Sequence, residues 1–184
     1  MTDNSKPKNK IKPALLVIDV QNRYMQTIPP RDKELSVFFI NLLIGLFRKH
    51  NFPVIRIYHQ DLEDGSIPGT EEFEYPKEIL IKPEDTQVIK SYSDGFNKTV
   101  LNDILKDKGS NTLFLCGLSA VGCVLATRTG ANNNDYKSFI VKDAIMSHNS
   151  EYTKNVEEMF GAVSYDVVSL IVENCQDRQK VELC

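Results

Sequence analysis

The sequence predicts an α/β protein of three layers, α/β/α, with a mostly parallel, six-stranded sheet of Rossmann-like type. Short apolar runs alternate along the chain with longer segments of helical periodicity. The strongest runs are apolar throughout, which is typical of strands covered on both faces. Such alternation indicates parallel strands joined by crossover helices. The 184 residues suit one domain with a substantial core.

Six apolar runs are expected to form the strands. The run ALLVIDV is the most continuous of them and carries a carboxylate, Asp19, next to its end, and Pro53 stops the preceding helix before the second run. The third run, TQVIK, is the shortest. The expected strands are residues 14–20, 53–59, 86–90, 112–117, 137–143 and 162–168.

Four segments between these runs have helical periodicity, and Gly109 suits the end of one of them. In the first segment the apolar positions spread over more than one helix face, which fits a buried helix or a subunit interface. The expected helices are residues 31–51, 97–108, 121–131 and 149–160.

Two further segments carry few apolar residues. Residues 1–12 are polar, basic and contain proline, so we expect a disordered tail before a domain at 13–184. Residues 60–85 are rich in proline, glycine and acidic side chains, and we expect a loop over the site that could gate substrate entry.

Composition excludes some function classes. The net charge of −3 gives no strong attraction to nucleic acid or to an anionic membrane. The four cysteines have no CxxC spacing, and the N-terminal residues form no apolar signal segment. We therefore expect a cytoplasmic protein with free thiols and with no nucleic-acid or membrane partner.

The stretch TLFLCGLSAVGCVLATRTGA, residues 112–131, holds two cysteines in different settings. Cys116 lies inside an expected strand, where a small apolar thiol packs well. Cys123 follows a turn at the start of the next helix, where free N–H groups and the helix dipole lower a thiol pKa. The thiolate is the nucleophilic form, so Cys123 is either a reactive thiol or a second packed one.

Asp19 and Lys90 end two other expected strands. Each also fits an ordinary structural role, a capping aspartate and an exposed strand-end lysine. Ligands bind beyond the carboxyl ends of parallel strands, however, so the three side chains are expected to meet in one cleft. There Asp19 would accept the thiol proton of Cys123, and Lys90 would hold the carboxylate.

The motifs LLVIDVQN, VIKSYSDGF, LFLCGLSAVGCVLATRTGA and FIVKDAIMS, in this order, resemble those of the isochorismatase-like cysteine hydrolases. This superfamily includes nicotinamidases and N-carbamoylsarcosine amidohydrolase. The resemblance covers about residues 13–170. It places the catalytic triad on Asp19, Lys90 and Cys123, and a cis peptide at Ser119–Ala120. It also implies an oxyanion hole from the N–H groups of Ala120 and Cys123.

The resemblance further implies cleavage of a C–N bond in a small amide, ureide or carbamoyl compound through a thioester. Relatives that act on isochorismate lack the cysteine, so Cys123 favours this chemistry. The resemblance also implies a homo-oligomer, a dimer or a tetramer. Aromatic and amide side chains close to the three motifs are expected to line the substrate pocket: Gln21, Asn22, Tyr24, His59, Tyr92 and Phe96.

The chain departs from nicotinamidases at their metal site. Tyr58 and Gln60 stand where metal ligands would be expected, so we expect no metal and no cofactor. Two alternative functions have little support in the sequence. Nucleotide binding is disfavoured because the G-x4-G spacing from Gly117 to Gly122 lacks the lysine of a phosphate-binding loop. A redox-active cysteine pair is disfavoured because Cys116 would have to leave its strand to reach Cys123. A catalytically silent member that serves as an interaction module remains the alternative.

Overall fold

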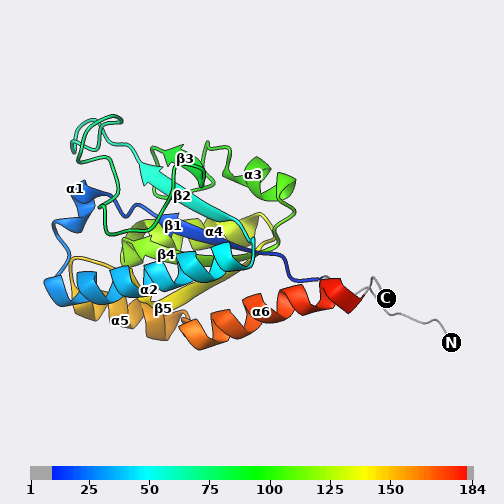
Figure 1. The fold of residues 1–184 in the computed structure, drawn as a ribbon. Helices are drawn as coiled ribbons and strands as arrows, with labels where there is room; N and C mark the ends of the chain where they lie inside the picture. Colours follow the sequence, from blue (N-terminus) through cyan, green and yellow to red (C-terminus); the bar gives the residue numbers. More distant parts are fainter. Residues whose placement is uncertain (1–9, 182–184) are drawn as a thin grey trace.

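Five parallel strands form the central sheet of the computed structural model, which describes residues 10–181 and the side chains of residues 10–175. The strand order is β3-β2-β1-β4-β5, and every neighbouring pair is parallel. The fold class is as predicted from the sequence (Figure 1). The strands are β1 (Pro13–Ile18), β2 (Val54–His59), β3 (Thr86–Lys90), β4 (Thr112–Leu118) and β5 (Lys137–Met146).

Strand β1 lies at the centre because all six of its side chains are apolar and can be buried on both faces. Leu15 and Val17 pack into one apolar cluster, and Leu16 and Ile18 pack into the other. This alternation follows from the two-residue period of a strand. The two clusters form the two halves of the core.

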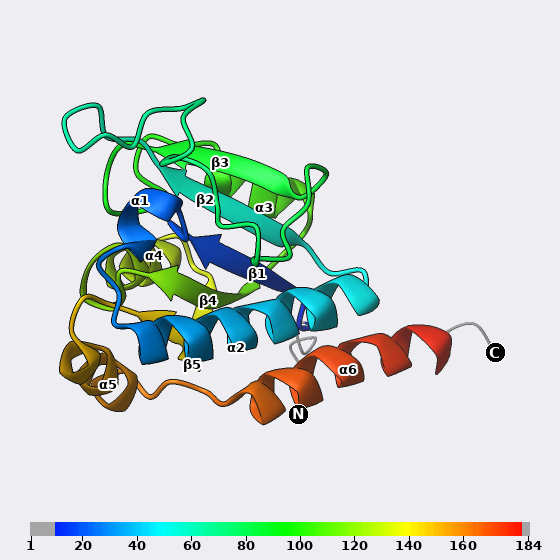
Figure 2. The same ribbon diagram turned by 60° about the vertical axis from the view of Figure 1, so that its left-hand side comes forward.

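Helices cover both faces of the sheet, as Figure 2 shows from a second direction. Helices α2 (Pro30–Lys49) and α6 (Tyr165–Val181) lie on one face. The other face is covered by α3 (Leu101–Asp107), the π-helical turn η1 (Ala120–Val124), α4 (Leu125–Asn133) and α5 (Ser150–Met159). A short helix, α1 (Asn22–Met25), follows β1.

The sixth expected strand, at residues 162–168, is wrong. In the described part of the chain this segment contributes one bridge, Val163 to Val141, and helix α6 begins at Tyr165. Val168 and Val172 are fully buried four residues apart, which is the spacing of one helix face. The β-branched residues of AVSYDVV match a strand as well as a helix, so local preference alone could not separate the two.

The middle of the 60–85 connection is anchored on the sheet, and its expected role in gating the site stays a prediction. Its Tyr75 is buried, and the hydroxyl lies 2.8 Å from the Val17 carbonyl oxygen and 2.7 Å from that of Ile57, two acceptors that share its one proton. Phe73 stacks on Tyr58 with ring centroids 5.0 Å apart. These aromatic contacts make the middle of the connection a part of the core.

The expected disordered tail, residues 1–12, falls mainly on residues 1–9, which lie outside the described residues. Of the rest, the Lys12 N–H donates to Asn111 Oδ1 at 2.9 Å, and the Lys10 carbonyl accepts from Asn111 Nδ2 at 2.8 Å. Residues 10–12 are therefore attached to the domain. None of the helices within residues 10–181 combines the length and the hydrophobicity that a membrane span requires.

Candidate active site

The site lies where the strand order reverses. Strands β2 and β3 extend the sheet on one side of β1, and β4 and β5 extend it on the other. Asp19 follows β1 and Cys123 lies in η1 directly after β4, so both flank this reversal at the carboxyl ends of the strands. At such a reversal the loops that follow β1 and β4 diverge, and the crevice between them is the usual ligand site of an open α/β sheet.

Asp19 leaves β1 in an unusual backbone conformation. Its φ is +52°, in the left-handed region that side chains other than glycine adopt at a cost. The Asp19 N–H still donates to the Ile57 carbonyl at 2.9 Å, which holds the turn against β2. Such conformations collect at functional sites, where surrounding structure enforces them.

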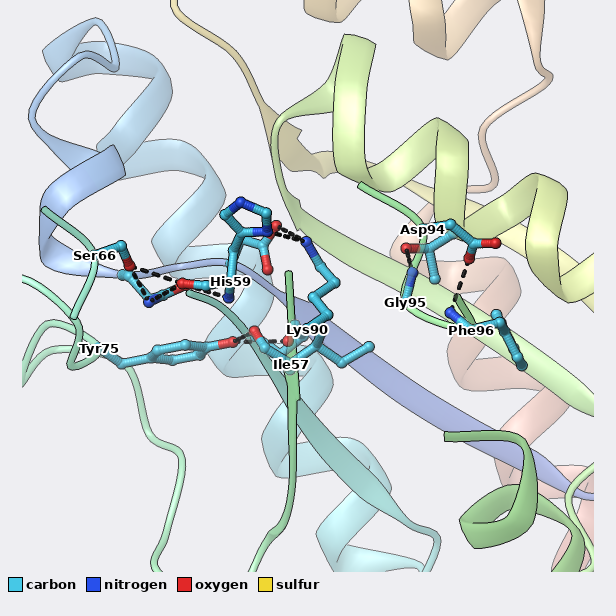
Figure 3. A network of polar contacts seen from close by, with 12 residues as sticks. Ile57, His59, Ser66, Tyr75, Lys90, Asp94, Gly95 and Phe96 are labelled. Atoms are coloured by element: carbon cyan, nitrogen blue, oxygen red, sulfur yellow. Dashed lines mark hydrogen bonds and ion pairs between the residues drawn. The ribbon is translucent and has the colours of Figure 1, made fainter. Parts of the chain in front are cut away.

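Lys90 and Asp19 form a buried ion pair. Lys90 Nζ lies 2.7 Å from Asp19 Oδ2, and the two residues are only 1% and 2% exposed. Lys90 ends β3, which β2 separates from β1, and its Nζ donates to the Asp19 carboxylate. Figure 3 shows the extended Lys90 side chain. A charge buried this deeply needs its partner, because desolvation of an unpaired ion costs several kcal/mol.

Cys123 completes the cluster. A carboxylate oxygen of Asp19, the sulfur of Cys123 and a ring nitrogen of His59 all lie within 4.8 Å of one another. Asp19 Oδ1 has no hydrogen-bond partner among the described residues, and the Cys123 thiol interacts with this carboxylate. The structure thus brings together the three side chains that the sequence singled out, and adds His59 to them.

The electrostatics of the thiol differ from the expectation. Burial raises the pKa of the Cys123 thiol to about 12, and the negative charge of Asp19 adds to the rise. A lowered pKa was expected from the helix start, but Cys123 sits in a five-residue turn and close to a carboxylate. The resting side chain is therefore a thiol, and an attack by sulfur requires a proton acceptor.

Asp19 is suited to accept that proton. Burial raises the pKa of Asp19 above its usual value, and the ammonium group of Lys90 opposes the rise. A raised pKa makes the Asp19 carboxylate a stronger base and reduces the difference between its pKa and the pKa of the Cys123 thiol. The ion pair with Lys90 favours the ionised form of Asp19, which is the form that can accept the thiol proton.

The turn η1, which contains Cys123, has backbone N–H groups of two kinds, some bonded within the turn and some not. The N–H groups of Gly122 and Val124 donate to the Ser119 carbonyl at 2.9 and 3.2 Å. No hydrogen bond outside the turn is found for the N–H groups of Ala120 and Cys123 within residues 10–181. The first N–H groups of a helix have no partner inside it, so these two are the candidates for an oxyanion hole.

The cis peptide lies one residue earlier than expected. It joins Leu118 to Ser119, so the expected position, Ser119–Ala120, is wrong by one bond. None of these residues is proline, the one residue type whose preceding bond adopts cis with any frequency. The sequence therefore had no local feature that separates one bond from the next.

Three expected pocket residues, Gln21, Tyr24 and His59, lie at the triad or against His59, and a fourth, Asn22, is bonded to the 60–85 connection. Gln21 is fully buried, and its amide is used within the protein, on the backbone of His59 and on Ser66. Asn22 Nδ2 donates to the Glu71 carbonyl at 2.8 Å. The Tyr24 ring lies 6.1 Å from that of His59.

The other two expected pocket residues, Tyr92 and Phe96, come from the turn after β3. The Tyr92 hydroxyl accepts from Lys98 Nζ at 3.1 Å, and this ring is 44% exposed. Phe96 packs on Tyr136 with ring centroids 5.7 Å apart. Figure 3 shows Phe96 well separated from His59 and Lys90. Their place in a pocket stays a prediction.

The cluster of Asp19, His59 and Cys123 is also the one group of metal-binding side chains that is compact enough to hold an ion within the described chain. An ammonium group already lies against it, because Lys90 Nζ contacts both Asp19 Oδ2 and His59 Nδ1. A metal ion bound by all three would lie next to this ammonium group, and the two positive charges would repel each other. The chain supplies its own positive charge at this point.

Sequence reasoning did not identify two residues that support the site. Ser66 is fully buried, and its hydroxyl donates to the His59 carbonyl at 2.7 Å, but a serine in a loop gives no sequence signal. Gly117 pairs with Ile18, directly before Asp19, at a φ of +110°. A glycine at the end of an expected strand, two residues before Ser119, was the one sequence signal for a close backbone contact at this position.

Comparison with known proteins matches the isochorismatase domain over residues 13–168. Streptothricin hydrolase of Streptomyces noursei is 30% identical over 136 residues, which cover 71% of this chain and 53% of the relative. Enterobactin synthase component B of Escherichia coli is 26% identical over 162 residues, or 76% and 56% of the two chains. The chain thus spans about half the length of these curated relatives.

Solved structures have the same fold. N-carbamoylsarcosine amidase from Thermoplasma acidophilum matches with a TM-score of 0.70 and 27% identity over 84% of this chain and 95% of that one. An isochorismatase-like hydrolase from Alkaliphilus metalliredigens matches with a TM-score of 0.75 and 24% identity, over 83% and 86% of the chains. The second likeness concerns the fold alone.

Proposed function

Because this chain belongs to the isochorismatase family, we propose that it is a cysteine hydrolase that cleaves a C–N bond of a small amide, ureide or carbamoyl compound. The observation that carries the proposal is the convergence of the Cys123 sulfur and the Asp19 carboxylate, with Lys90 paired to that carboxylate. The named amidase among the structural relatives supports the same bond type.

The first half of the reaction forms a thioester. Asp19 accepts the proton of the Cys123 thiol as the sulfur attacks the substrate carbonyl carbon. The N–H groups of Ala120 and Cys123 stabilise the oxygen that becomes negative. The C–N bond then breaks, and the leaving nitrogen takes the proton from Asp19 and departs as an amine or ammonia.

The second half regenerates the enzyme. Asp19, again ionised, accepts a proton from water, and the resulting hydroxide attacks the thioester carbonyl. The C–S bond breaks, the acid product leaves, and the thiolate recovers its proton from Asp19. The ammonium group of Lys90 holds Asp19 Oδ2, and Oδ1, which has no hydrogen-bond partner among the described residues, is left to accept the proton.

A substrate panel with two matched variants tests the proposal. Small amides, ureides and carbamoyl compounds are incubated with the protein, and released ammonia or amine is measured. We expect turnover of at least one class, its loss in Cys123→Ala, and its retention in Cys116→Ala. Cys116 is the control, since it is fully buried and its thiol lies against the Leu16 carbonyl at 3.4 Å.

Two outcomes would contradict the proposal. Turnover that survives Cys123→Ala would exclude a thioester mechanism. No turnover of any panel member would favour the alternative, a catalytically silent member of the family that acts as an interaction module.

A further inference from the structure

His59 contacts the ion pair directly. It ends β2, between β1 and β3, and its Nδ1 lies 3.2 Å from Lys90 Nζ. The same ammonium group lies 2.7 Å from Asp19 Oδ2. Figure 3 shows the side chains of His59 and Lys90 pointing toward one another. The ammonium is therefore shared between a carboxylate and an imidazole.

The direction of this contact fixes the proton of the imidazole. An ammonium group has three donors and no acceptor, so Nδ1 must offer its lone pair. The ring proton of neutral His59 then lies on Nε2. Burial lowers the pKa of His59, and the positive charge of Lys90 lowers it further, so the ring is neutral at pH 7.

The backbone of His59 is held by buried polar side chains. Gln21 Oε1 accepts from the His59 N–H at 2.7 Å, and Gln21 Nε2 donates to the His59 carbonyl at 3.0 Å. Gln21 Nε2 also donates to Ser66 Oγ at 2.9 Å, and Ser66 donates to the same carbonyl at 2.7 Å. Both Gln21 and Ser66 are fully buried. These hydrogen bonds fix the backbone of His59 and therefore the position from which its imidazole ring extends.

We propose that His59 is a positioning residue for Lys90: its Nδ1 lone pair holds the ammonium on Asp19 Oδ2, which leaves Oδ1, unpartnered among the described residues, to accept the proton of the Cys123 thiol. The proposal rests on the proposed function, since it assigns a role within that triad. Without the second acceptor, the ammonium would be free to move toward Oδ1 and compete with the thiol for it.

The proposal includes a dependence on pH. Protonated His59 would present an N–H to the ammonium, and the contact would be lost. Several groups face the ring: Asp19 from the end of β1, Lys90 from β3, Tyr24 from α1, and the carboxylates of Asp61 and Asp64 from the 60–85 connection. The carboxylates oppose the lowering of the pKa, and burial together with Lys90 outweighs them.

Two variants of His59 separate positioning from substrate contact. In His59→Asn the amide oxygen stands near the place of Nδ1 and remains an acceptor; in His59→Leu no acceptor remains. With the best panel substrate, we expect His59→Leu to lower kcat by up to about 100-fold with KM little changed. We expect His59→Asn to restore much of that loss and to remove the contribution of His59 to the acid limb of the pH profile.

A measurement without substrate tests the contact itself. In protein labelled with ¹⁵N-histidine, the ring nitrogen shifts of His59 should report a proton on Nε2 at pH 7, and this preference should weaken in Lys90→Met. A proton on Nδ1 would overturn the proposal even if the protein hydrolyses nothing. Equal kcat in the Leu and Asn variants, with the loss confined to KM, would also overturn it and make His59 a substrate contact.

Discussion

Gly117→Ala should damage the site without touching any of its reactive groups. Gly117 lies opposite Ile18 in the β1–β4 pair, and its φ is +110°. An added Cβ would stand 2.1 Å from the Ile18 carbonyl oxygen and 2.8 Å from the Ile18 nitrogen. Those atoms belong to backbone, so β1 and β4 must separate there by about 1 Å, directly before Asp19.

Two costs combine in this variant. Overpacking at a buried backbone contact costs about 1–3 kcal/mol, and an alanine at a φ reserved for glycine costs about 1–3 kcal/mol more. For a chain of this length, the sum of about 2–6 kcal/mol corresponds to a fall in Tm of roughly 5–20 °C. A displacement of Asp19 by about 1 Å would lower kcat by about 100-fold.

Thermal melts and turnover of the best panel substrate measure both effects. Gly45→Ala is the matched control, because an added Cβ at this exposed position of α2 meets nothing within 4 Å. It should raise the free energy of unfolding by about 0.5–1 kcal/mol and leave kcat unchanged. If Gly117→Ala has the Tm and the kcat of the wild type, the close approach of Gly117 to Ile18 does not position Asp19.

Three further predictions concern the triad. Asp19→Asn should lower kcat by roughly 10²–10⁴-fold, because an amide accepts no proton; near-normal turnover in steady-state assays would reject the acceptor role. Lys90→Met should cost about 3–5 kcal/mol of unfolding free energy by leaving the Asp19 charge unpaired, and the double variant with Asp19→Asn should recover stability but not turnover in denaturant titrations. Iodoacetamide should alkylate Cys123 at a rate that rises about tenfold per pH unit from pH 7 to 10, because the thiolate fraction does so below a pKa of about 12; a plateau near neutral pH would show a lower pKa.

Much of the fold was accessible from the sequence because its central strands, β1 and β4, are buried on both faces. A continuous apolar run as short as that of β1 is typical of a fully buried strand, and the alternation with helices then dictates a parallel sheet. The error at residues 162–168 arose where β-branched residues lie on one face of α6, around Val168 and Val172. There tertiary packing on the sheet decides between strand and helix.

The convergence of Asp19, Lys90 and Cys123 was accessible for a similar reason. Each ends or follows a strand, and parallel strands bring their carboxyl ends to one edge. The electrostatics were not accessible, because the pKa of Cys123 depends on burial and on the distance to Asp19. Nor was the arrangement around His59, since its supports Gln21 and Ser66 come from distant positions with no shared pattern.

Trapping the covalent intermediate tests the central claim most directly. A slowly hydrolysed panel substrate is mixed with the protein, the reaction is quenched in acid, and the digested peptides are weighed by mass spectrometry. We predict an acyl group on the peptide that contains Cys123, absent from the Cys123→Ala variant and unchanged in Cys116→Ala. Turnover with no acyl group on Cys123 at any quench time, in a substrate whose deacylation is rate-limiting, would contradict the account.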